Sequence, residues 1–238
     1  MENYILHKAD TRGAADHGWL NSKHSFSFGG YYDPERMNFG VLRVLNDDTV
    51  SGGMGFGKHP HDNMEIISIP LEGELVHKDS MGNEAVIKQG EIQVMSAGTG
   101  IYHSEQNHVH DKTVKFLQIW IIPNKRNVTP RYDQQEINLS VKNEFVQVLS
   151  PNKDDAGVWI YQDAYFSIGT FDKDTQLSYQ LKNAEHGVYA FILEGNTVIN
   201  GHELNKRDGL GIWGTDALTV DTKQGSRILL MEVPMQVN

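Results

Sequence analysis

The chain has 238 residues, 21 Lys plus Arg against 31 Asp plus Glu, a formal net charge of −10, eleven histidines and no cysteine. Without cysteine there is no disulfide, thiolate nucleophile or zinc finger, so a bound metal would need His, Asp or Glu ligands. The dispersed negative charge repels phosphate backbones and argues against direct nucleic-acid binding.

Charges early in the chain argue against a secretory signal, because an apolar signal core does not tolerate them. The densest apolar run, Phe116–Ile122, is too short to cross a bilayer. We therefore expect a soluble, cytoplasmic, globular protein that makes no membrane contact. The early charged residues are Glu2, Lys8, Asp10, Arg12 and Asp16.

Short runs rich in Val, Ile, Tyr, Phe and Trp, separated by turn residues, predict strands through most of the chain. Helical periodicity is not sustained over ten residues anywhere. The predicted class is all-β, with sheets closed into barrels or sandwiches that hide their edges. In chain order, the predicted strands are Gly40–Leu45, Glu65–Leu71, Glu74–Lys78, Ala85–Lys88, Ile92–Ser96, Val114–Ile122, Glu144–Leu149, Val188–Leu193, Asn196–Ile199, Gly211–Trp213 and Ile228–Val233.

An internal repeat links the two halves of the chain. Leu71-Glu72-Gly73-Glu74 returns as Leu193-Glu194-Gly195-Asn196, an offset of 122, and Gly90 returns as Gly209, an offset of 119. The smaller offset indicates a shorter hairpin in the second copy, where Asn200-Gly201 is typical of a type I′ turn. Glycine at the repeated points predicts positive φ or a close backbone approach at a barrel corner.

The repeat predicts two tandem β-barrels of similar build. The stretch from Pro130 to about Asn143 is rich in charged and amide side chains, which is typical of a boundary. We therefore expect an N-terminal barrel over residues 1–135 and a C-terminal barrel over residues 136–238.

Two pairs of residues in the first half are candidate metal ligands. His59 and His61 lie two apart, as do His103 and Glu105, and residues two apart on a strand project from the same face. If the two strands are neighbours, three imidazoles and one carboxylate converge inside the barrel. Such a set suits iron(II), manganese, nickel, copper or zinc and leaves coordination positions open, as a catalytic site requires.

Two alternatives stay open on the residues alone. Glu65 lies an even number of positions from His59 and His61, so on a strand it would face the same side, and it could replace Glu105 as the fourth ligand. His108 and His110 repeat the spacing of two, but they lie in a polar stretch that is typical of a surface loop.

Six motifs follow one another along the first 135 residues: His17-Gly18-Trp19-Leu20, His24-Ser25-Phe26-Ser27-Phe28, Tyr32-Asp33-Pro34, Arg43–Asp48, Gly55–His61 and Met95–Glu105. Together they resemble the pirin family, whose members are bicupins, and the likeness becomes looser after these residues. The broader pattern from Gly53 to Glu65, followed by Gly90, Gly98 and His103, is similar to the two cupin motifs.

The resemblance implies two tandem cupin barrels of the double-stranded β-helix, or jelly-roll, type. It also implies that His59, His61, His103 and Glu105 are the metal ligands, whereas the position of Glu65 is not a ligand in pirins. The implied cofactor is one divalent transition metal. Iron(II) is the first expectation, and zinc, manganese, nickel, cobalt and copper are alternatives.

An activity follows from the same resemblance, since bacterial pirin-like proteins are quercetinases. The chain is then expected to be a dioxygenase that binds a flavonol and O2. The flavonol would chelate the metal through its 3-hydroxyl and carbonyl, Glu105 would take up the hydroxyl proton as catalytic base, and the heterocycle would open with loss of carbon monoxide. The alternative, implied by eukaryotic pirins, is a metal-dependent regulatory or redox-sensing protein that binds a regulatory partner, with incidental quercetinase activity.

The repeat predicts one metal per chain, in the first barrel. Shifted by the offsets of 122 and 119, the four ligand positions fall on Leu181, Asn183, Thr222 and Gln224. The second half keeps His186 and His202, which stand alone in the sequence and are expected at the surface.

Overall fold

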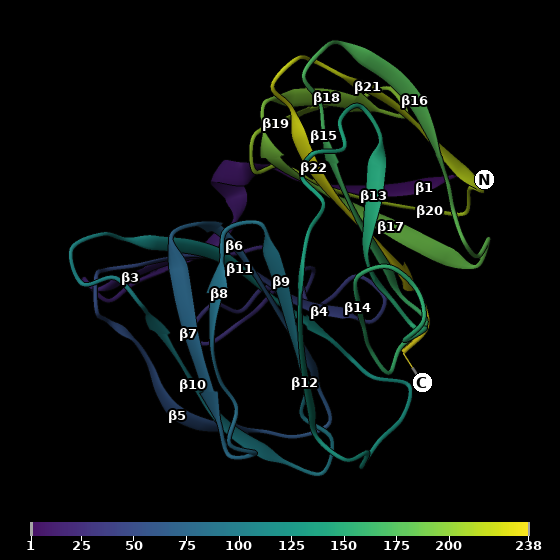
Figure 1. Ribbon diagram of the computed structural model, residues 1–238. Coiled ribbons are helices and arrows are strands. Elements are labelled where there is room, and N and C mark those ends of the chain that lie inside the picture. The colour runs from purple at the N-terminus through teal and green to yellow at the C-terminus, as the bar shows by residue number, and fades with distance from the viewer. Residues whose placement is uncertain (1, 238) are drawn as a thin grey trace.

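The computed structural model describes residues 2–237 and consists of two β-barrels that lie side by side (Figure 1). Over these residues it contains strands β1 to β22 and one short 3-10 helix, Ala9–Thr11. The predicted all-β class is confirmed. Each barrel combines a seven-stranded sheet with a four-stranded sheet.

The first barrel holds the strands with the predicted ligands, at one edge of its smaller sheet. The larger sheet contains, in spatial order, β12 (Arg131–Glu136), β9 (Glu91–Ser96), β6 (Glu65–Glu72), β11 (Val114–Ile121), β4 (Leu42–Val50), β3 (Leu20–His24) and β2 (Gly13–Asp16). The smaller sheet contains β5 (Gly55–His61), β10 (Ile101–Asn107), β7 (Glu74–Asp79) and β8 (Glu84–Lys88).

The second barrel repeats this order, so that β17, β22 and β15 stand where β6, β11 and β4 stand in the first. Its larger sheet contains β1 (Asn3–His7), β20 (Gly209–Trp213), β17 (His186–Glu194), β22 (Arg227–Pro234), β15 (Tyr165–Thr170), β13 (Phe145–Ser150) and β14 (Val158–Trp159). Its smaller sheet contains β16 (Thr175–Gln180), β21 (Ala217–Thr222), β18 (Asn196–Ile199) and β19 (His202–Asn205).

The strand nearest the start of the chain belongs to the second barrel. β1 pairs antiparallel with β20, with Ile5 opposite Gly211 (Figure 1). Its alternating apolar residues pack on both sides of that sheet, Leu6 against the interior of the second barrel and Ile5 against the core between the barrels. The structure therefore differs at this strand from the predicted assignment of residues 1–135 to the first barrel.

Glycine at the first repeated point is required in both barrels. Gly73 and Gly195 have φ of +79° and +74°, and an added Cβ would lie 3.1 Å from the Thr113 carbonyl oxygen or 2.7 Å from Ser226 Oγ. The two-residue hairpin at Asn200-Gly201 is also confirmed, since both residues have positive φ, as a type I′ turn demands.

The predicted equivalence of Gly90 with Gly209 is wrong by two residues. Ser68 on β6 pairs with Gln93 on β9. The counterpart of Ser68, with the offset of 122, is Ala190 on β17, which pairs with Leu210 on β20. Gln93 therefore corresponds to Leu210, and the offset between β9 and β20 is 117. The counterpart of Gly90 is therefore Arg207, which takes the left-handed conformation, with φ of +71°.

The two largest apolar cores lie between the barrels and inside the second barrel. One lies between the two larger sheets and contains buried residues of both barrels, such as Ile67 and Leu117 from the first and Phe166 and Leu229 from the second. The other fills the interior of the second barrel. The interior of the first barrel combines a smaller apolar cluster, which includes Leu75 and Phe116, with buried polar residues such as His103 and Glu105.

Candidate metal centre

The two strands with the predicted ligands are neighbours. β5 and β10 pair antiparallel with His103 directly opposite His59, and His61 lies further along β5. Pro60 separates the two histidines of β5, which is tolerated because β5 is the edge strand of its sheet.

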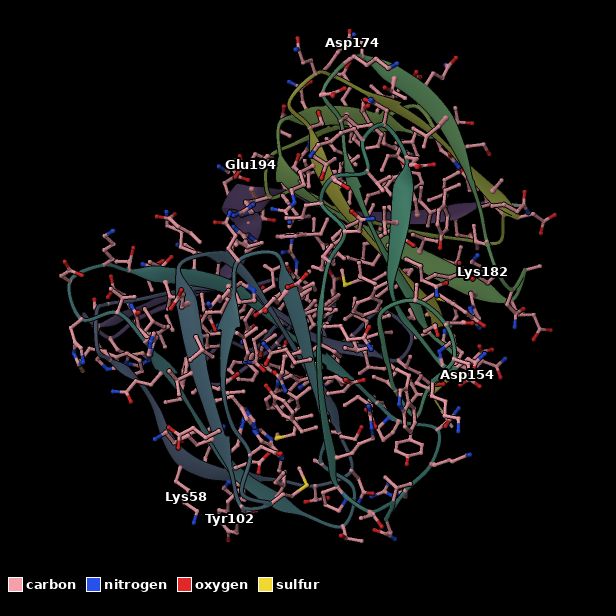
Figure 2. The ribbon with its side chains drawn as sticks, viewed as in Figure 1. Lys58, Tyr102, Asp154, Asp174, Lys182 and Glu194 are labelled. Carbon is pink, nitrogen blue, oxygen red and sulfur yellow. The ribbon has the colours of Figure 1, made fainter. Side chains whose placement is uncertain are left out.

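The residues beside these histidines point away from the barrel. Figure 2 shows Lys58 and Tyr102 at the outer surface, where Lys58 Nζ lies 5.4 Å from the centroid of the Tyr102 ring. Because strand side chains alternate, His59 and His103, each one residue further along, point into the barrel. His103 is buried, and His59 is partly buried.

The rings of His59, His61 and His103, here called the histidine cluster, lie with their centroids 4.5 to 4.9 Å apart. The Nε2 atoms of His59 and His103 are 3.0 Å apart, and one nitrogen of each ring lies within 4.8 Å of the others. Burial and the neighbouring rings lower the pKa of His61 to about 4 and of His103 to about 2. Both rings are neutral at pH 7, and converging neutral imidazoles suit a transition metal.

Glu105 lies beside the cluster and is hydrogen-bonded to the opposite sheet. Ser68 Oγ donates to its carboxylate at 2.8 Å, and Gln118 Nε2 donates at 2.7 Å. Burial raises the pKa of Glu105 to about 7 in spite of these bonds. One oxygen of the Glu105 carboxylate lies within 4.8 Å of a ring nitrogen of His103 and of a ring nitrogen of His77. The fourth predicted ligand is therefore adjacent to the histidine cluster.

The other candidate ligands lie elsewhere. Glu65 accepts a 2.6 Å hydrogen bond from Ser96 Oγ and does not line the cavity of the histidine cluster. His108 and His110 lie in the loop between β10 and β11, where His108 Nε2 is 3.8 Å from a Glu74 oxygen. None of these candidates belongs to a group of three possible ligands among residues 2–237.

His77 is a site residue that the sequence prediction missed. It is fully buried on β7, directly opposite Glu105, and its ring centroid is 5.3 Å from that of His103. Its Nε2 lies 3.1 Å from Asp79 Oδ2. The spacing of two between His77 and Asp79 is the same signal that identified the other pairs, and could have found it.

A cavity of about 240 Å³ opens beside the histidine cluster. Aromatic rings line one side of it: Trp120 lies 4.9 Å from His61 and Phe28 lies 5.4 Å from Trp120, measured between centroids. Glu105 and Gln118 lie on the same cavity, as do four buried polar residues of β3 and β4. These four, here called the polar wall, are Ser22, His24, Asn46 and Asp48.

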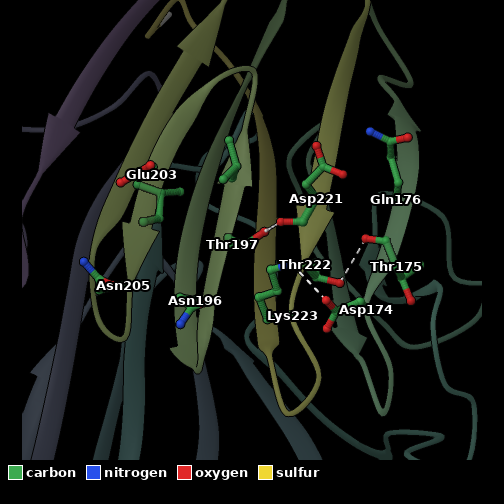
Figure 3. A pocket seen from close by; sticks show the side chains of 12 residues that line it. Asp174, Thr175, Gln176, Asn196, Thr197, Glu203, Asn205, Asp221, Thr222 and Lys223 are labelled. Carbon is green, nitrogen blue, oxygen red and sulfur yellow. Dashed lines mark hydrogen bonds and ion pairs between the residues drawn. The ribbon is translucent and has the colours of Figure 1, made fainter.

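A larger hollow, of about 620 Å³, lies across β16, β21, β18 and β19 of the second barrel (Figure 3). Most of its lining residues are polar, and they include Asp174, Glu203 and Asp221. Lys223 Nζ is already 2.8 Å from Asp174 Oδ2, and no histidine is among the lining residues. This hollow therefore lacks the ligand chemistry of the first barrel.

Strand register identifies the residues of the second barrel that stand where the ligands stand in the first. Glu105 on β10 pairs with His77 on β7. The offset of 122 takes His77 to Ile199 on β18, which pairs with Val220 on β21, so Val220 is the counterpart of Glu105. The predicted counterparts Asn183, Thr222 and Gln224 are therefore wrong, and Leu181 stands at the position of His61, not of His59 as predicted. The positions of His59, His61, His103 and Glu105 are taken by Tyr179, Leu181, Leu218 and Val220, which all pack in the interior core.

The predicted surface position of His186 is also wrong. Its side chain is buried, and its Nδ1 lies 3.2 Å from an oxygen of the fully buried Glu232. The Tyr179 hydroxyl donates to the same carboxylate at 2.9 Å, so these polar groups are partners of one another. His202 is partly buried, with its ring 4.0 Å from that of Tyr4.

Two family models match the chain: "Pirin" over residues 6–121 and "Quercetinase C-terminal cupin domain" over residues 147–233. The chain is 43% identical over 229 residues to a protein of Escherichia coli K12 named quercetin 2,3-dioxygenase, covering 96% of this chain and 98% of that one. It is 38% identical to a pirin-like protein of Caulobacter vibrioides, covering 94% and 96% of the two chains.

Among solved structures, the crystal structure of the bacterial pirin YhhW from Escherichia coli in complex with nickel(II) superposes with a TM-score of 0.93. The identity is 42%, and the match covers 99% of this chain and 100% of that one. The family models and the relatives thus match residues of both barrels, and the chain belongs to the pirin family.

Proposed function

We propose that the chain is a metal-dependent quercetin 2,3-dioxygenase, an oxidoreductase that opens the heterocycle of a flavonol with O2 and releases carbon monoxide. The observation that carries the proposal is the cavity in which three inward-facing imidazoles converge beside a buried carboxylate. The near full-length similarity to a protein named for this activity supports the same assignment.

His59, His61, His103 and Glu105 would hold one divalent transition metal, for which we propose iron(II). The donors support a first-row ion, because two of the rings are neutral and the carboxylate is adjacent. The nickel(II) in the related Escherichia coli structure is of the same class. When bound, such an ion supplies a Lewis-acidic, redox-active centre with open coordination positions.

Glu105 is the residue that we assign to proton transfer. In the metal-free protein burial raises its pKa to about 7, so it takes up a proton more readily than an exposed carboxylate does, and it lies at the cavity. The Glu105 carboxylate accepts the proton of the flavonol 3-hydroxyl. Ser68 and Gln118 hold the carboxylate in place through the two hydrogen bonds that they donate.

Trp120 and Phe28 position the flat substrate and exclude water. Their rings lie edge to face along one side of the cavity, between the histidine cluster and the polar wall. A planar aromatic ligand packs well against such rings, and removal of water strengthens every polar contact at the reacting atoms.

Turnover of quercetin tests the proposal. Protein loaded in separate samples with iron, manganese, nickel, cobalt or copper is mixed with quercetin, with and without O2, and flavonol absorbance and carbon monoxide are followed. We expect O2-dependent loss of absorbance with release of carbon monoxide in at least one sample. Absence of turnover with every metal would contradict the proposal.

Location and protein partners stay predictions. Among residues 2–237, no helix is long and apolar enough to cross a membrane. We propose a cytoplasmic enzyme, in line with the expectation from the sequence. A regulatory protein partner, implied by the eukaryotic pirins, is tested separately by measuring whether partner binding changes between metal-loaded and metal-free protein.

A further inference from the structure

The polar wall lines the cavity on the larger sheet, on strands β3 and β4. Its residues form two cross-strand pairs, Ser22 with Asp48 and His24 with Asn46, which all face the barrel interior. Each is at most 3% exposed. Four buried polar side chains on one face of two strands are unusual in a barrel interior, where apolar residues are the rule.

Contacts within the polar wall leave some of its polar atoms unused. Ser22 Oγ donates to Asp48 Oδ1, and His24 Nε2 lies 2.8 Å from Ser22 Oγ. Two buried atoms, His24 Nδ1 and Asn46 Oδ1, have no hydrogen-bond partner among the residues that the structure describes. Because an unpartnered buried polar group is costly, these atoms indicate that a ligand supplies the missing partner.

The polar wall and the histidine cluster share one cavity. Asn46 on β4 lies opposite Gln118 on the neighbouring strand β11, and Gln118 donates a hydrogen bond to the Glu105 carboxylate. The polar wall therefore begins on the strand next to Gln118. The ring of His24 lies 5.3 Å from that of Phe28, which continues the aromatic side of the cavity from Trp120. A flat ligand held at the histidine cluster therefore extends along these rings toward the wall.

We propose that the polar wall is a second binding subsite, which takes free hydroxyl groups on the part of an aromatic substrate remote from the histidine cluster. This inference rests on the proposed function. Asn46 Oδ1 and the Asp48 carboxylate are acceptors, so the fitting group is a hydrogen-bond donor such as a phenol. A carboxylate or a methyl ether has no proton to donate to these acceptors and would not fit.

Two flavonols separate the subsite from the rest of the cavity. Quercetin and 3-hydroxyflavone share the 3-hydroxyl and carbonyl that bind near the metal, but 3-hydroxyflavone lacks the other hydroxyls. We measure kcat/KM for both with O2, and Kd for both without O2, on the metal-loaded protein. We expect quercetin to be preferred by about tenfold or more, because a site built to bind a hydroxyl leaves its groups unpaired against the analogue.

Asn46→Leu removes the acceptor and keeps a side chain of similar volume. We expect it to reduce the preference for quercetin by about tenfold, in Kd as well as kcat/KM, with little change for 3-hydroxyflavone. The matched control is Asn21→Leu, which lies on the exposed face of β3 and should leave the preference unchanged. Asp48→Asn is the second variant, since its amide oxygen still accepts from Ser22 and its amide nitrogen replaces an acceptor.

Each outcome decides the proposal. Equal losses for both flavonols in Asn46→Leu and Asp48→Asn, or an unchanged preference, would overturn the subsite. If no metal supports turnover but anaerobic binding shows the preference and its loss in Asn46→Leu, the subsite stands and the dioxygenase function fails. If the Asn46→Leu variant loses its metal or shows no cooperative thermal transition, the preference measured on the Asp48→Asn variant alone decides the proposal.

Discussion

In the first barrel a row of polar side chains crosses the inner face of the larger sheet, whereas the same row in the second barrel is mostly apolar. Ser68, Gln118 and Gln93 lie side by side on neighbouring strands of the first barrel. Strand register places Ala190, Leu230 and Leu210 at these positions in the second. Asn46, the next member of the row, corresponds to Ser167, which remains polar.

The difference shows how one architecture divides stability and chemistry between two copies. The second barrel fills its interior with buried aliphatic and aromatic side chains, which stabilise it by about 25 cal/mol per Å² of apolar surface. The first barrel keeps a cavity and buried polar groups, which cost stability unless each finds a partner. The apolar core between the larger sheets joins the functional barrel to the better-packed one.

His103→Leu, which installs the residue of the second barrel's equivalent position, should have the largest effect. It removes one of four proposed ligands and the central ring of the histidine cluster, so we expect bound metal and quercetin turnover to be lost. Metal content after purification and dialysis measures this directly. A variant that retains its full metal content would show that His103 is not a ligand.

A reciprocal exchange tests the interiors. Leu210→Gln buries an amide between Ala190 and Leu6, where it finds no partner, and should lower the free energy of unfolding by about 2–4 kcal/mol. Gln93→Leu should cost nothing, because both polar atoms of the Gln93 amide are buried without a partner among residues 2–237. Urea unfolding of the two variants checks the pair, and equal destabilisation would contradict it.

Gln118→Leu, which introduces the side chain that the second barrel has at Leu230, removes a donor from the Glu105 carboxylate. We expect the metal affinity to fall by about 10–100-fold, as is typical when a partner of a metal ligand is lost. Competition with a chelator measures the change. Gln118→Glu is not a suitable control because it adds a charge, so Gln106→Leu, at an exposed position of β10, serves instead. An unchanged affinity would show that Gln118 does not support Glu105.

The pH dependence of stability provides a further test, at Glu65. Burial raises its pKa from 4.5 to about 7, so the folded protein keeps a proton that the unfolded chain releases. This stabilisation is fully present below about pH 4.5 and is lost as the pH rises to about 7. In metal-free protein, Glu65→Gln should therefore gain on the order of 2 kcal/mol relative to wild type between pH 5 and 8. Thermal melts at several pH values measure it, and a constant difference would contradict the shift.

The smallest effect is expected for His108→Ala. The side chain lies in the exposed loop after β10, away from the histidine cluster, so metal content and turnover should stay at the wild-type level. Metal analysis beside the His103→Leu sample provides the comparison. Loss of metal here would restore the pair His108 and His110 as candidate ligands.

Strand periodicity predicted the all-β class. The spacing of two predicted that His59 and His61, and likewise His103 and Glu105, face the same interior, as they do on β5 and β10. The exact counterparts in the second barrel were out of reach, since Arg207 takes a positive φ where Gly90 stands and hides the true offset. The polar wall was missed because its role depends on which strands become neighbours, which local sequence does not encode. For His77 the spacing of two to Asp79 was visible in the sequence, but its place beside Glu105 follows only from the pairing of β7 with β10.

The pairing of β1 with β20 has a consequence for folding. Residue Ile5 finds its partner Gly211 more than two hundred residues further along the chain, and closing so long a loop is entropically costly and slow. Until β1 docks, β20 presents an unpaired edge on which a second chain could add a strand. Completion of the second barrel therefore waits for both ends of the chain, and unpaired β20 is the point at which a crowded, partly folded population would aggregate.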